Sequence, residues 1–454
     1  MKTRNALTAQ IAIALASFLV PFVGSAFNLA LPQIGRDLEM NMVTLGLMVS
    51  AYLLPCAMFQ MPAARLGDLY GRRKIYLLGL GAFAFFSLMS SLAWSSTSLI
   101  VFRALTGVGS AMMFGTAMAI LTSLFPQQQR GKVLGINTAV VYFALSVGPL
   151  CGGLLTHHLG WRSIFVVCCL IGTVAAVFSL SAIRDEWAEA RGEPFDFIGT
   201  ALYALTLFAI IYGFSLLPNA ASWMLLILGI IAAFAFVRFE RRCRFPVFNL
   251  SLLVNNRAFR LSTVAATIHY SVTAVSTLLL SFYLQYVRGL DAQHAGFLLM
   301  LQPIVQTLIS PLAGRWSDRI HPASLATAGM VMVMLSLSGL CFLTESTSWF
   351  VLIVLLLLFG AGFGTFSSPN VNMIMSSVDK TAYGTASAVT GTARLIGQSF
   401  SIGVATLAIH LYLGTAAVSV EHHAAFMSSL RLTCAIFVGL CVVGVYASAS
   451  RLRK

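Results

Sequence analysis

A short charged turn at residues 64–74, between two long apolar stretches, holds the residues of this sequence best placed to do chemistry. It reads Ala-Arg-Leu-Gly-Asp-Leu-Tyr-Gly-Arg-Arg-Lys, with four cations and one carboxylate, in a chain where 9% of residues are charged. A near copy, Gly-Arg-Trp-Ser-Asp-Arg, recurs at residues 314–319 in the second half. A signature that returns once per half indicates a chain built from two parallel repeats.

Two cations and one histidine fall within apolar stretches: Arg103, Arg394 and His269. An arginine inside a membrane costs at least about 2.5–3.5 kcal/mol, so one that persists usually faces a cavity or a partner. The alternative is an arginine near a helix end whose side chain reaches back to the interface. Free histidine titrates near about pH 6.5, so His269 could exchange protons, or it could be neutral and bonded to a neighbouring helix. No Asp or Glu is predicted at mid-membrane.

Several uncharged polar side chains also interrupt the apolar stretches and could contact a small-molecule substrate. They are Asn28, Gln302, Gln306, Asn370, Asn372 and Gln398. Pro303 and Pro369 stand beside some of them and would free backbone polar groups toward a cavity. Hydrogen bonding between helices explains any single one equally well, so these residues are candidates rather than a defined site.

Other chemistries find no support in the sequence. A phosphate-binding glycine-rich loop followed by Lys-Ser or Lys-Thr is missing, which argues against ATP-driven transport. The pairs His157-His158 and His422-His423 lack the spacing that would aim both rings at one metal. Most of the eight cysteines lie in apolar stretches and are expected to be small fillers. We therefore predict a protein that is not an enzyme and that carries neither a metal nor a cofactor.

The composition predicts the fold class without any motif. Hydrophobic residues make up 58% of the chain and the mean hydropathy is +0.88, whereas soluble domains have about 25% charged residues. Apolar segments of about 20 residues, long enough to cross a bilayer, recur many times. Within lipid such segments must be helices, because a helix satisfies its backbone polar groups internally. The prediction is an all-α polytopic membrane protein.

Fourteen membrane spans are expected, arranged as six, two and six. The first follows Lys2 and Arg4 and is too long for the apolar core of a signal peptide, which has about 7–15 residues. The first span ends near residue 31. The other thirteen lie at 41–63, 75–94, 98–124, 132–156, 161–183, 197–217, 221–238, 261–286, 292–314, 323–343, 348–375, 382–411 and 428–450. The eighth has about 18 residues, near the lower limit for crossing, so a surface hairpin and twelve spans are the alternative.

These spans predict three parts of the chain. Residues 1–183 would form an N-terminal six-helix bundle, and residues 261–454 a C-terminal six-helix bundle. Residues 184–260 would form a cytoplasmic linker with two extra membrane helices and a basic loop. With both termini on the cytoplasmic side, 22 of the 28 basic residues fall in cytoplasmic segments, as the positive-inside rule requires. The net charge of +14 thus reflects membrane topology, with contact to lipid head groups, and not a nucleic-acid partner.

The charged turn resembles the loop between helices two and three of the major facilitator superfamily. Asp68, Gly71 and Arg72 have the spacing of Gly-x-x-x-Asp-x-x-Gly-Arg-(Arg/Lys), with Ala64 in place of the leading glycine. The resemblance implies that Asp68 caps a helix end in the opposite bundle, where the helix dipole favours negative charge. Gly71 and Arg72, and in the repeat Asp318 with Arg319, would then form a conformational lock that closes the cytoplasmic side.

Two further segments resemble elements of the same superfamily. Arg103-Ala-Leu-Thr-Gly-Val-Gly is similar to Arg-x-x-Gln-Gly-x-Gly, with Thr106 in place of Gln, and implies that Arg103 faces the central cavity and takes part in proton coupling. The segment at 148–153 is similar to the Gly-Pro-x-x-Gly-Gly element of antiporters, so it would supply a hinge between the two bundles. Its glycines allow close helix packing and its proline bends the helix. The hinge residues are Gly148, Pro149, Gly152 and Gly153.

With the six-two-six order, three weaker segments narrow the resemblance to the fourteen-helix drug:proton antiporters. They are Asn28-Leu-Ala-Leu-Pro, Trp161-Arg-Ser-Ile-Phe and Tyr283-Leu-Gln-Tyr-Val-Arg-Gly. The resemblance implies a monomeric bacterial inner-membrane exporter that works by alternating access and uses the proton gradient as its energy source. An uptake symporter or facilitator on the same fold is one alternative. A membrane sensor that has lost transport is another.

One position departs from that family. Many members have an acid five residues before the Asn of the Asn-x-Ala-Leu-Pro segment, where this chain has Val23. Without that carboxylate the formal charges of the cavity are Arg103 and Arg394, both positive. We therefore expect a neutral, zwitterionic or anionic substrate rather than a lipophilic cation.

Overall fold

The computed structural model describes residues 3–38, 40, 42–217, 219–248, 250–272, 279–290, 292–414 and 423–452, and every regular element within these ranges is a helix. Long apolar segments form helices because each helical backbone donor and acceptor finds its partner within the same segment. The predicted all-α fold is confirmed for the described residues.

Eight long helices occupy the first part of the chain. They are α1 (Thr3–Asp37), α2 (Met42–Tyr70), α3 (Arg72–Ser91), α4 (Ser96–Leu124), α5 (Gln127–Leu159), α6 (Arg162–Ala182), α7 (Phe197–Ser215) and α8 (Ala220–Glu240). Local chemistry places several of their ends. Ser95 and Ser98 form a reciprocal capping box at the start of α4, and the Asp196 side chain accepts from the amide of Gly199 at the start of α7.

The second part of the chain is also helical, but more broken. It contains α9 (Ser251–Asn255), α10 (Arg257–Tyr270), α11 (Leu280–Phe282) leading into the π-helix η2 (Tyr283–Val287), α12 (Ala292–Leu299), α13 (Leu301–Ser317), α14 (Pro322–Leu340), α15 (Trp349–Ser376), the 3-10 helix η3 (Lys380–Ala382), α16 (Tyr383–Leu413) and α17 (His423–Ala449). Asn256 caps α10 by accepting from the amide of Phe259. The expected span 261–286 is therefore represented by α10 and by α11 with η2, with residues 273–278 outside the described ranges.

Twelve of the described helical segments are long and apolar enough to cross a membrane. They include α7 and α8, so the eighth expected span coincides with a helix of 21 residues. The twelve do not include α2 or α10, which coincide with the second and ninth expected spans. The count of fourteen spans therefore stays a prediction.

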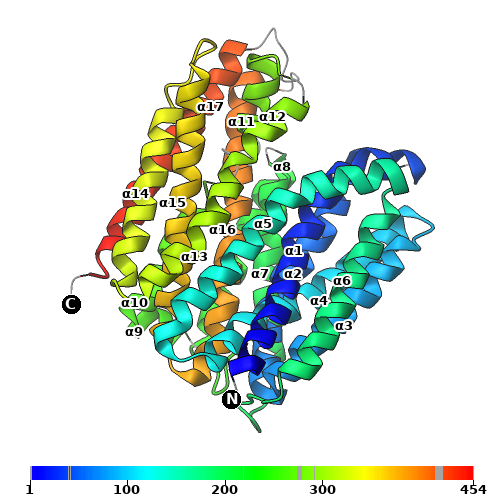
Figure 1. Ribbon diagram of the computed structural model, residues 1–454, viewed down its shortest axis with the longest axis vertical. Helices are drawn as coiled ribbons and strands as arrows, with labels where there is room; N and C mark the ends of the chain where they lie inside the picture. The colour runs from blue at the N-terminus through cyan, green and yellow to red at the C-terminus, as the bar shows by residue number, and fades with distance from the viewer. Residues whose placement is uncertain are drawn as a thin grey trace.

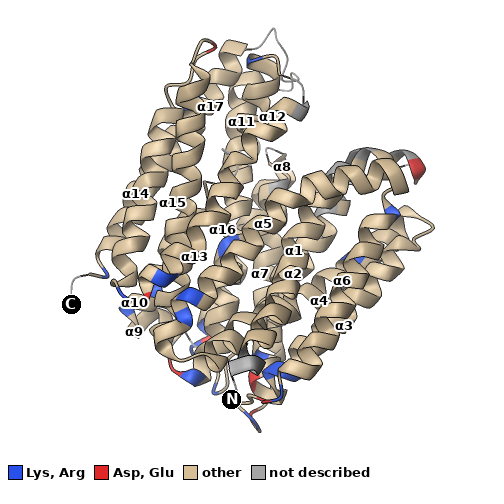
Figure 2. Cartoon of the chain, viewed as in Figure 1, with Lys and Arg blue, Asp and Glu red and all other residues tan. Residues whose placement is uncertain are grey.

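Two groups of helices stand side by side, with α7 and α8 between them (Figure 1). In this view α1 to α6 form the group on the right and α10 to α17 the group on the left. The two groups diverge toward the top of the view and converge toward the bottom. Most Lys and Arg residues lie toward the lower end of both groups (Figure 2), and we call this the basic end.

The apolar side chains are buried in three clusters. One cluster draws its buried members from Ala9 to Ile183, and a second from Ala265 to Cys441. A third joins side chains of α2, α5, α7, α8, α10, α15 and α16, so it connects both groups with the two helices between them. This third cluster therefore holds the two groups together.

Candidate functional site

The first charged turn is buried where α2 and α3 meet the start of α16. Asp68 is 1% exposed, and its Oδ1 accepts from Nε of Arg72 at 2.8 Å. A second nitrogen of Arg72 donates to the carbonyl of Lys380 at 2.9 Å, in the turn that precedes α16. Gly384, near the start of α16, lies so close that a Cβ there would be 2.5 Å from Oδ2 of Asp68. The carboxylate thus lies at the positive end of the α16 dipole, in the opposite group of helices.

The second copy of the turn makes the matching contact in the other direction. Oδ1 of Asp318 accepts from the amide of Gly131 at 2.8 Å, and Oδ2 accepts from the amide of Lys132 at 2.9 Å. Both amides belong to the first two turns of α5. Partial burial raises the pKa of the Asp318 carboxyl above its ordinary value, and these two hydrogen bonds oppose the rise. Each acid therefore reaches a helix of the opposite group.

Arg319 does not take part in this contact. Its side chain is exposed, and among the described residues no hydrogen bond or ion pair joins it to Asp318. The reason is that both oxygens of Asp318 are directed at amides of α5. The expected acid-and-arginine pair is present in the first copy of the turn alone.

The two copies also differ in how closely the helices cross. A Cβ on Gly314 of α13 would collide with the carbonyl of Gly131 and lie 2.9 Å from Cα of Gly135, both in α5. Ala64, at the corresponding position of the first copy, lies 3.6 Å from the point where a Cβ on Gly115 of α4 would stand. Glycine is therefore required at position 314, where α13 crosses a helix of the other group. Alanine fits at position 64, where α2 packs against α4 of the same group.

The acid-rich segment after α6 wraps around the first turn. Glu186 accepts from the amides of Arg73 at 2.8 Å and Lys74 at 3.2 Å, at the start of α3. Gly71 has a φ of 117°, and a Cβ on it would collide with Glu186. The amide of Ala190 donates to the carbonyl of Asp68 at 2.9 Å. Glu186 is more than 100 residues from the basic turn in the sequence, so the charge pattern alone does not reveal this contact.

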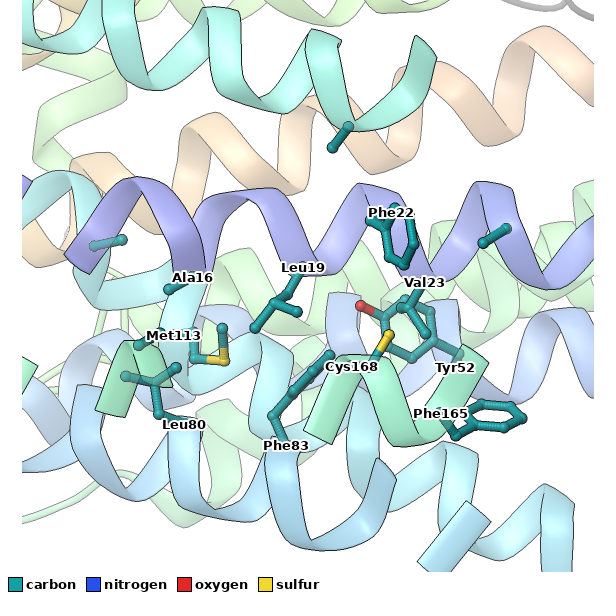
Figure 3. Close-up of a cluster of buried hydrophobic side chains, with 14 of the residues drawn as sticks. Ala16, Leu19, Phe22, Val23, Tyr52, Leu80, Phe83, Met113, Phe165 and Cys168 are labelled. Atoms are coloured by element: carbon teal, nitrogen blue, oxygen red, sulfur yellow. The ribbon is translucent and has the colours of Figure 1, made fainter. Parts of the chain in front are cut away.

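Arg103 is buried without a carboxylate beside it. It is 2% exposed, donates from Nε to the carbonyl of Met48 at 3.0 Å, and stacks over Phe27 at 3.5 Å. Val23, the position where an acid is usual in the resembling family, is buried in the apolar cluster near Tyr52 and Cys168 (Figure 3). No described Asp or Glu pairs with Arg103. A guanidinium in this position can attract an anionic group.

Arg394 lies where the two groups of helices meet. It belongs to α16, is half-buried, and stands over the ring of Phe114 of α4 at 4.9 Å. Nearby, Tyr142 of α5 shares a hydrogen bond of 2.5 Å with Ser367 of α15. Tyr142 and Cys56 of α2 are among the side chains close to Arg394. The second cation is thus central, with side chains of both groups around it.

His269 is enclosed by aromatic rings. It is 0% exposed, and its ring centroid lies 4.0 Å from those of both Phe363 and Phe366. Neither ring nitrogen has a hydrogen-bond partner among the described residues. These surroundings are those of a neutral packed histidine and not of a group that exchanges protons with water. The hydrogen-bonded neutral histidine considered from the sequence is not seen either.

Replacing His269 by Phe is expected to leave transport unchanged and to stabilise the protein by about 1 kcal/mol. Each unpaired buried polar atom costs about 1–3 kcal/mol, and the larger ring offsets part of the gain. The thermal midpoint in detergent and a transport assay measure the two effects. His410→Phe, at a half-buried position of α16, is the matched control. Loss of transport by a well-folded H269F protein would instead assign His269 a part in coupling.

Two of the uncharged polar candidates already form side-chain hydrogen bonds between helices, and the others differ in their burial. Asn370 donates to the carbonyl of Ser262 at 3.1 Å and accepts from Arg451 at 2.7 Å, so it joins α15 to α10 and to the end of α17. Asn372 donates to Ser317 at 3.0 Å. The side-chain amides of Asn370 and Asn372 therefore hold helices together. Gln302 and Gln306 are buried in α13, Gln398 is half-buried in α16 and Asn28 is exposed on α1.

The glycines of the expected hinge pack within one group of helices. A Cβ on Gly148 would collide with Ser25 of α1, and one on Gly152 would lie 2.6 Å from Cα of Ala26. Pro149 and Gly153 are half-buried in α5. The close approach predicted for this segment is present, but it joins α5 to α1 of the same group. The role of this segment as a hinge between the two bundles stays a prediction.

The chain matches known membrane transporters in sequence and in fold. The family model of the Major Facilitator Superfamily matches residues 13–402. The riboflavin transporter RibZ of Clostridioides difficile (strain 630) is 30% identical over 397 residues, which cover 87% of this chain and 86% of that protein. The multidrug resistance protein Stp of Mycobacterium tuberculosis (strain CDC 1551 / Oshkosh) is 31% identical over 408 residues, which cover 88% and 75%.

Among solved structures, the human organic anion transporter MFSD10 has a similar fold. The TM-score is 0.68 over 99% of this chain and 100% of that one, at 15% sequence identity. At this identity the likeness concerns the fold alone. The sequence relatives and the fold thus point to the same family of multi-pass membrane transporters.

Proposed function

Because the chain belongs to the major facilitator superfamily, we propose that it exports a small molecule across the bacterial inner membrane by alternating access. Export would be coupled to proton antiport, with the proton gradient as the energy source. Both termini would face the cytoplasm, which makes the basic end the cytoplasmic end. The transporter would work as a monomer within the bilayer.

The observation that carries this proposal is the reciprocal contact at the basic end. Asp68 lies at the start of α16 and Asp318 at the start of α5, each in the opposite group of helices. Toward the other end the two groups diverge (Figure 1). This is the arrangement expected of one end state in alternating access, closed to the cytoplasm and open to the outside.

The charges around the proposed route favour particular substrates. Arg103 and Arg394 bring two cations to the interior, and Val23 removes the usual counter-charge. We propose that the substrate is neutral, zwitterionic or anionic. Riboflavin, the compound in the name of one relative, is the first compound to test for transport.

Transport by everted membrane vesicles tests the proposal. Vesicles from cells that express the protein should accumulate the substrate when the proton gradient is present and lose it when an ionophore collapses the gradient. The substrate is found by a growth screen of a deletion strain against a compound panel at two pH values. Accumulation by right-side-out vesicles instead would indicate uptake.

Replacing Val23 by Asp is expected to increase export of lipophilic cations such as ethidium. The new carboxylate would lie near Arg103 and could offer a titratable counter-charge. A gain of about tenfold is expected, which corresponds to about 1.4 kcal/mol of attraction. Dye efflux from cells measures it, and Val23→Asn is the control of similar shape without the charge. Strong pH-driven export of quaternary ammonium dyes by the native protein would contradict the proposed substrate class.

A further inference from the structure

Two acids meet at the basic end between the two extra helices, and the proposed transport cycle does not use them. Asp196 precedes α7 and Glu240 is the last residue of α8. The two helices pack against each other, and the start of α7 lies beside the end of α8. A Cβ on Gly199 would touch Oδ2 of Asp196 and lie 2.7 Å from Oε1 of Glu240. The two carboxyl groups therefore flank the same point.

The oxygens that face this point have no normal hydrogen-bond partner. Glu240 is 3% exposed, and neither of its oxygens accepts a hydrogen bond of ordinary geometry among the described residues. The backbone amides of Val247 and Phe248 lie near its carboxyl group. Oδ1 of Asp196 accepts from the amide of Gly199 at 2.8 Å, whereas Oδ2 is unpaired. Each carboxyl thus directs an unused acceptor toward the other.

The neighbouring charges do not neutralise the pair. Arg65 of α2 is the nearest cation, and it forms an ion pair of 2.5 Å with Glu193 of the linker. Its Nε is buried and has no partner. The Cys243 thiol, in the loop after α8, lies beside Asp196. One arginine thus faces three carboxyl groups, so the buried Glu240 and the half-buried Asp196 would leave two negative charges in excess.

We propose that Asp196 and Glu240 form a proton-binding site that holds one shared proton. Two carboxylates side by side in a buried place cannot both be charged without a large cost. A proton on one of them removes the repulsion and supplies a donor between Oδ2 of Asp196 and one oxygen of Glu240. When the proton leaves, it passes to water at the basic end. The carboxylate that it leaves behind can then attract Arg65, whose Nε is unpaired among the described residues.

The position of the pair links it to the contacts between the two groups. The hydroxyl of Tyr203 in α7 shares a hydrogen bond of 2.7 Å with Thr392 of α16 and donates to the carbonyl of Ala57 in α2 at 3.3 Å. Arg65 precedes Asp68 by less than one helical turn. Movement of Arg65 away from Glu193 would release part of the linker segment that surrounds the first charged turn. Proton loss would therefore weaken the closed state of the basic end.

Thermal stability as a function of pH tests the site on the purified full-length protein. A carboxyl that keeps its proton in the folded state makes the folded protein bind more protons than the unfolded chain, so stability falls as pH rises. The native protein should show this fall from about pH 4, where a free carboxyl loses its proton, up to the pH at which the shared proton leaves the folded site. Glu240→Gln fixes the neutral form and should flatten the curve, and Asp196→Asn should do the same while keeping a good helix cap. Asp185→Asn, at an exposed position, should leave the native slope unchanged.

A second measurement keeps the proposal testable if a variant folds poorly. Potentiometric titration between about pH 6 and pH 9 should show roughly one fewer proton released by E240Q than by the native protein, because an ordinary carboxyl has already lost its proton below this range. Equal slopes and equal proton counts in the native protein and in whichever of E240Q and D196N folds would overturn the proposal. The readouts involve no substrate, so they are independent of whether export or antiport is correct.

Discussion

Replacing Asp68 by Asn is expected to abolish transport while the protein remains folded. The substitution removes the ion pair with Arg72, whose guanidinium stays buried at the contact with Lys380. Breaking one partner of a buried pair costs about 3–5 kcal/mol. It also removes the negative charge from the start of α16. Since both losses fall on the closed basic end, they would shift the population toward the opposite state by a factor of ~100 or more.

Three measurements separate this result from misfolding. Export by everted vesicles should fall to background, whereas expression level and thermal midpoint should show a folded protein. Arg319→Ala is the matched control at the second turn and should transport normally, because that side chain is exposed. Asp318→Asn should give an intermediate loss, since one amide oxygen can still accept from α5. Native flux in D68N would show that the contact of Asp68 with α16 does not govern the transport cycle.

The helices and the two charged turns were predictable because each changes the local pattern of the sequence. Apolar stretches of about 20 residues indicate helices in lipid, and the charges at 64–74 interrupt them. The contact of Asp68 with the opposite group came from resemblance to a family. No periodicity in one chain shows which helix a loop will meet, because that contact depends on packing of distant segments.

The pairing of charges was the part that sequence could not give. The sequence predicts no Asp or Glu at mid-membrane and says nothing more of Glu240, which is buried against Asp196. Glu186 lies between two expected spans, yet it accepts from an amide at the start of α3. Being at the end of a span says how deep a residue lies, and not whether a neighbouring helix covers it. His269 shows the same limit, since its aromatic neighbours come from α15.

The crossing of α5 and α13 gives the basic end a steric requirement that the acids do not supply. The carbonyl of Gly131 occupies the place where a side chain at position 314 would begin, and Ser368 of α15 lies within 2.9 Å of the same point. Backbone cannot move aside as a flexible side chain can. A larger residue at 314 must therefore separate the two helices, and it would do so at the contact that joins the two groups.

Replacing Gly314 by Val is accordingly expected to reduce transport at least ~10-fold by holding the basic end open. Overpacking costs about 1–3 kcal/mol, and here it applies to the closed state alone, so it shifts the equilibrium between states. A cysteine introduced at Ser368 in a cysteine-free background is buried in the closed state and should react faster with a thiol reagent in G314V. Gly439→Val makes the same change where a Cβ meets no atom within 4 Å. Equal labelling in G314V and G439V would show that the crossing does not govern closure, because the added methyl groups would then fit in both states.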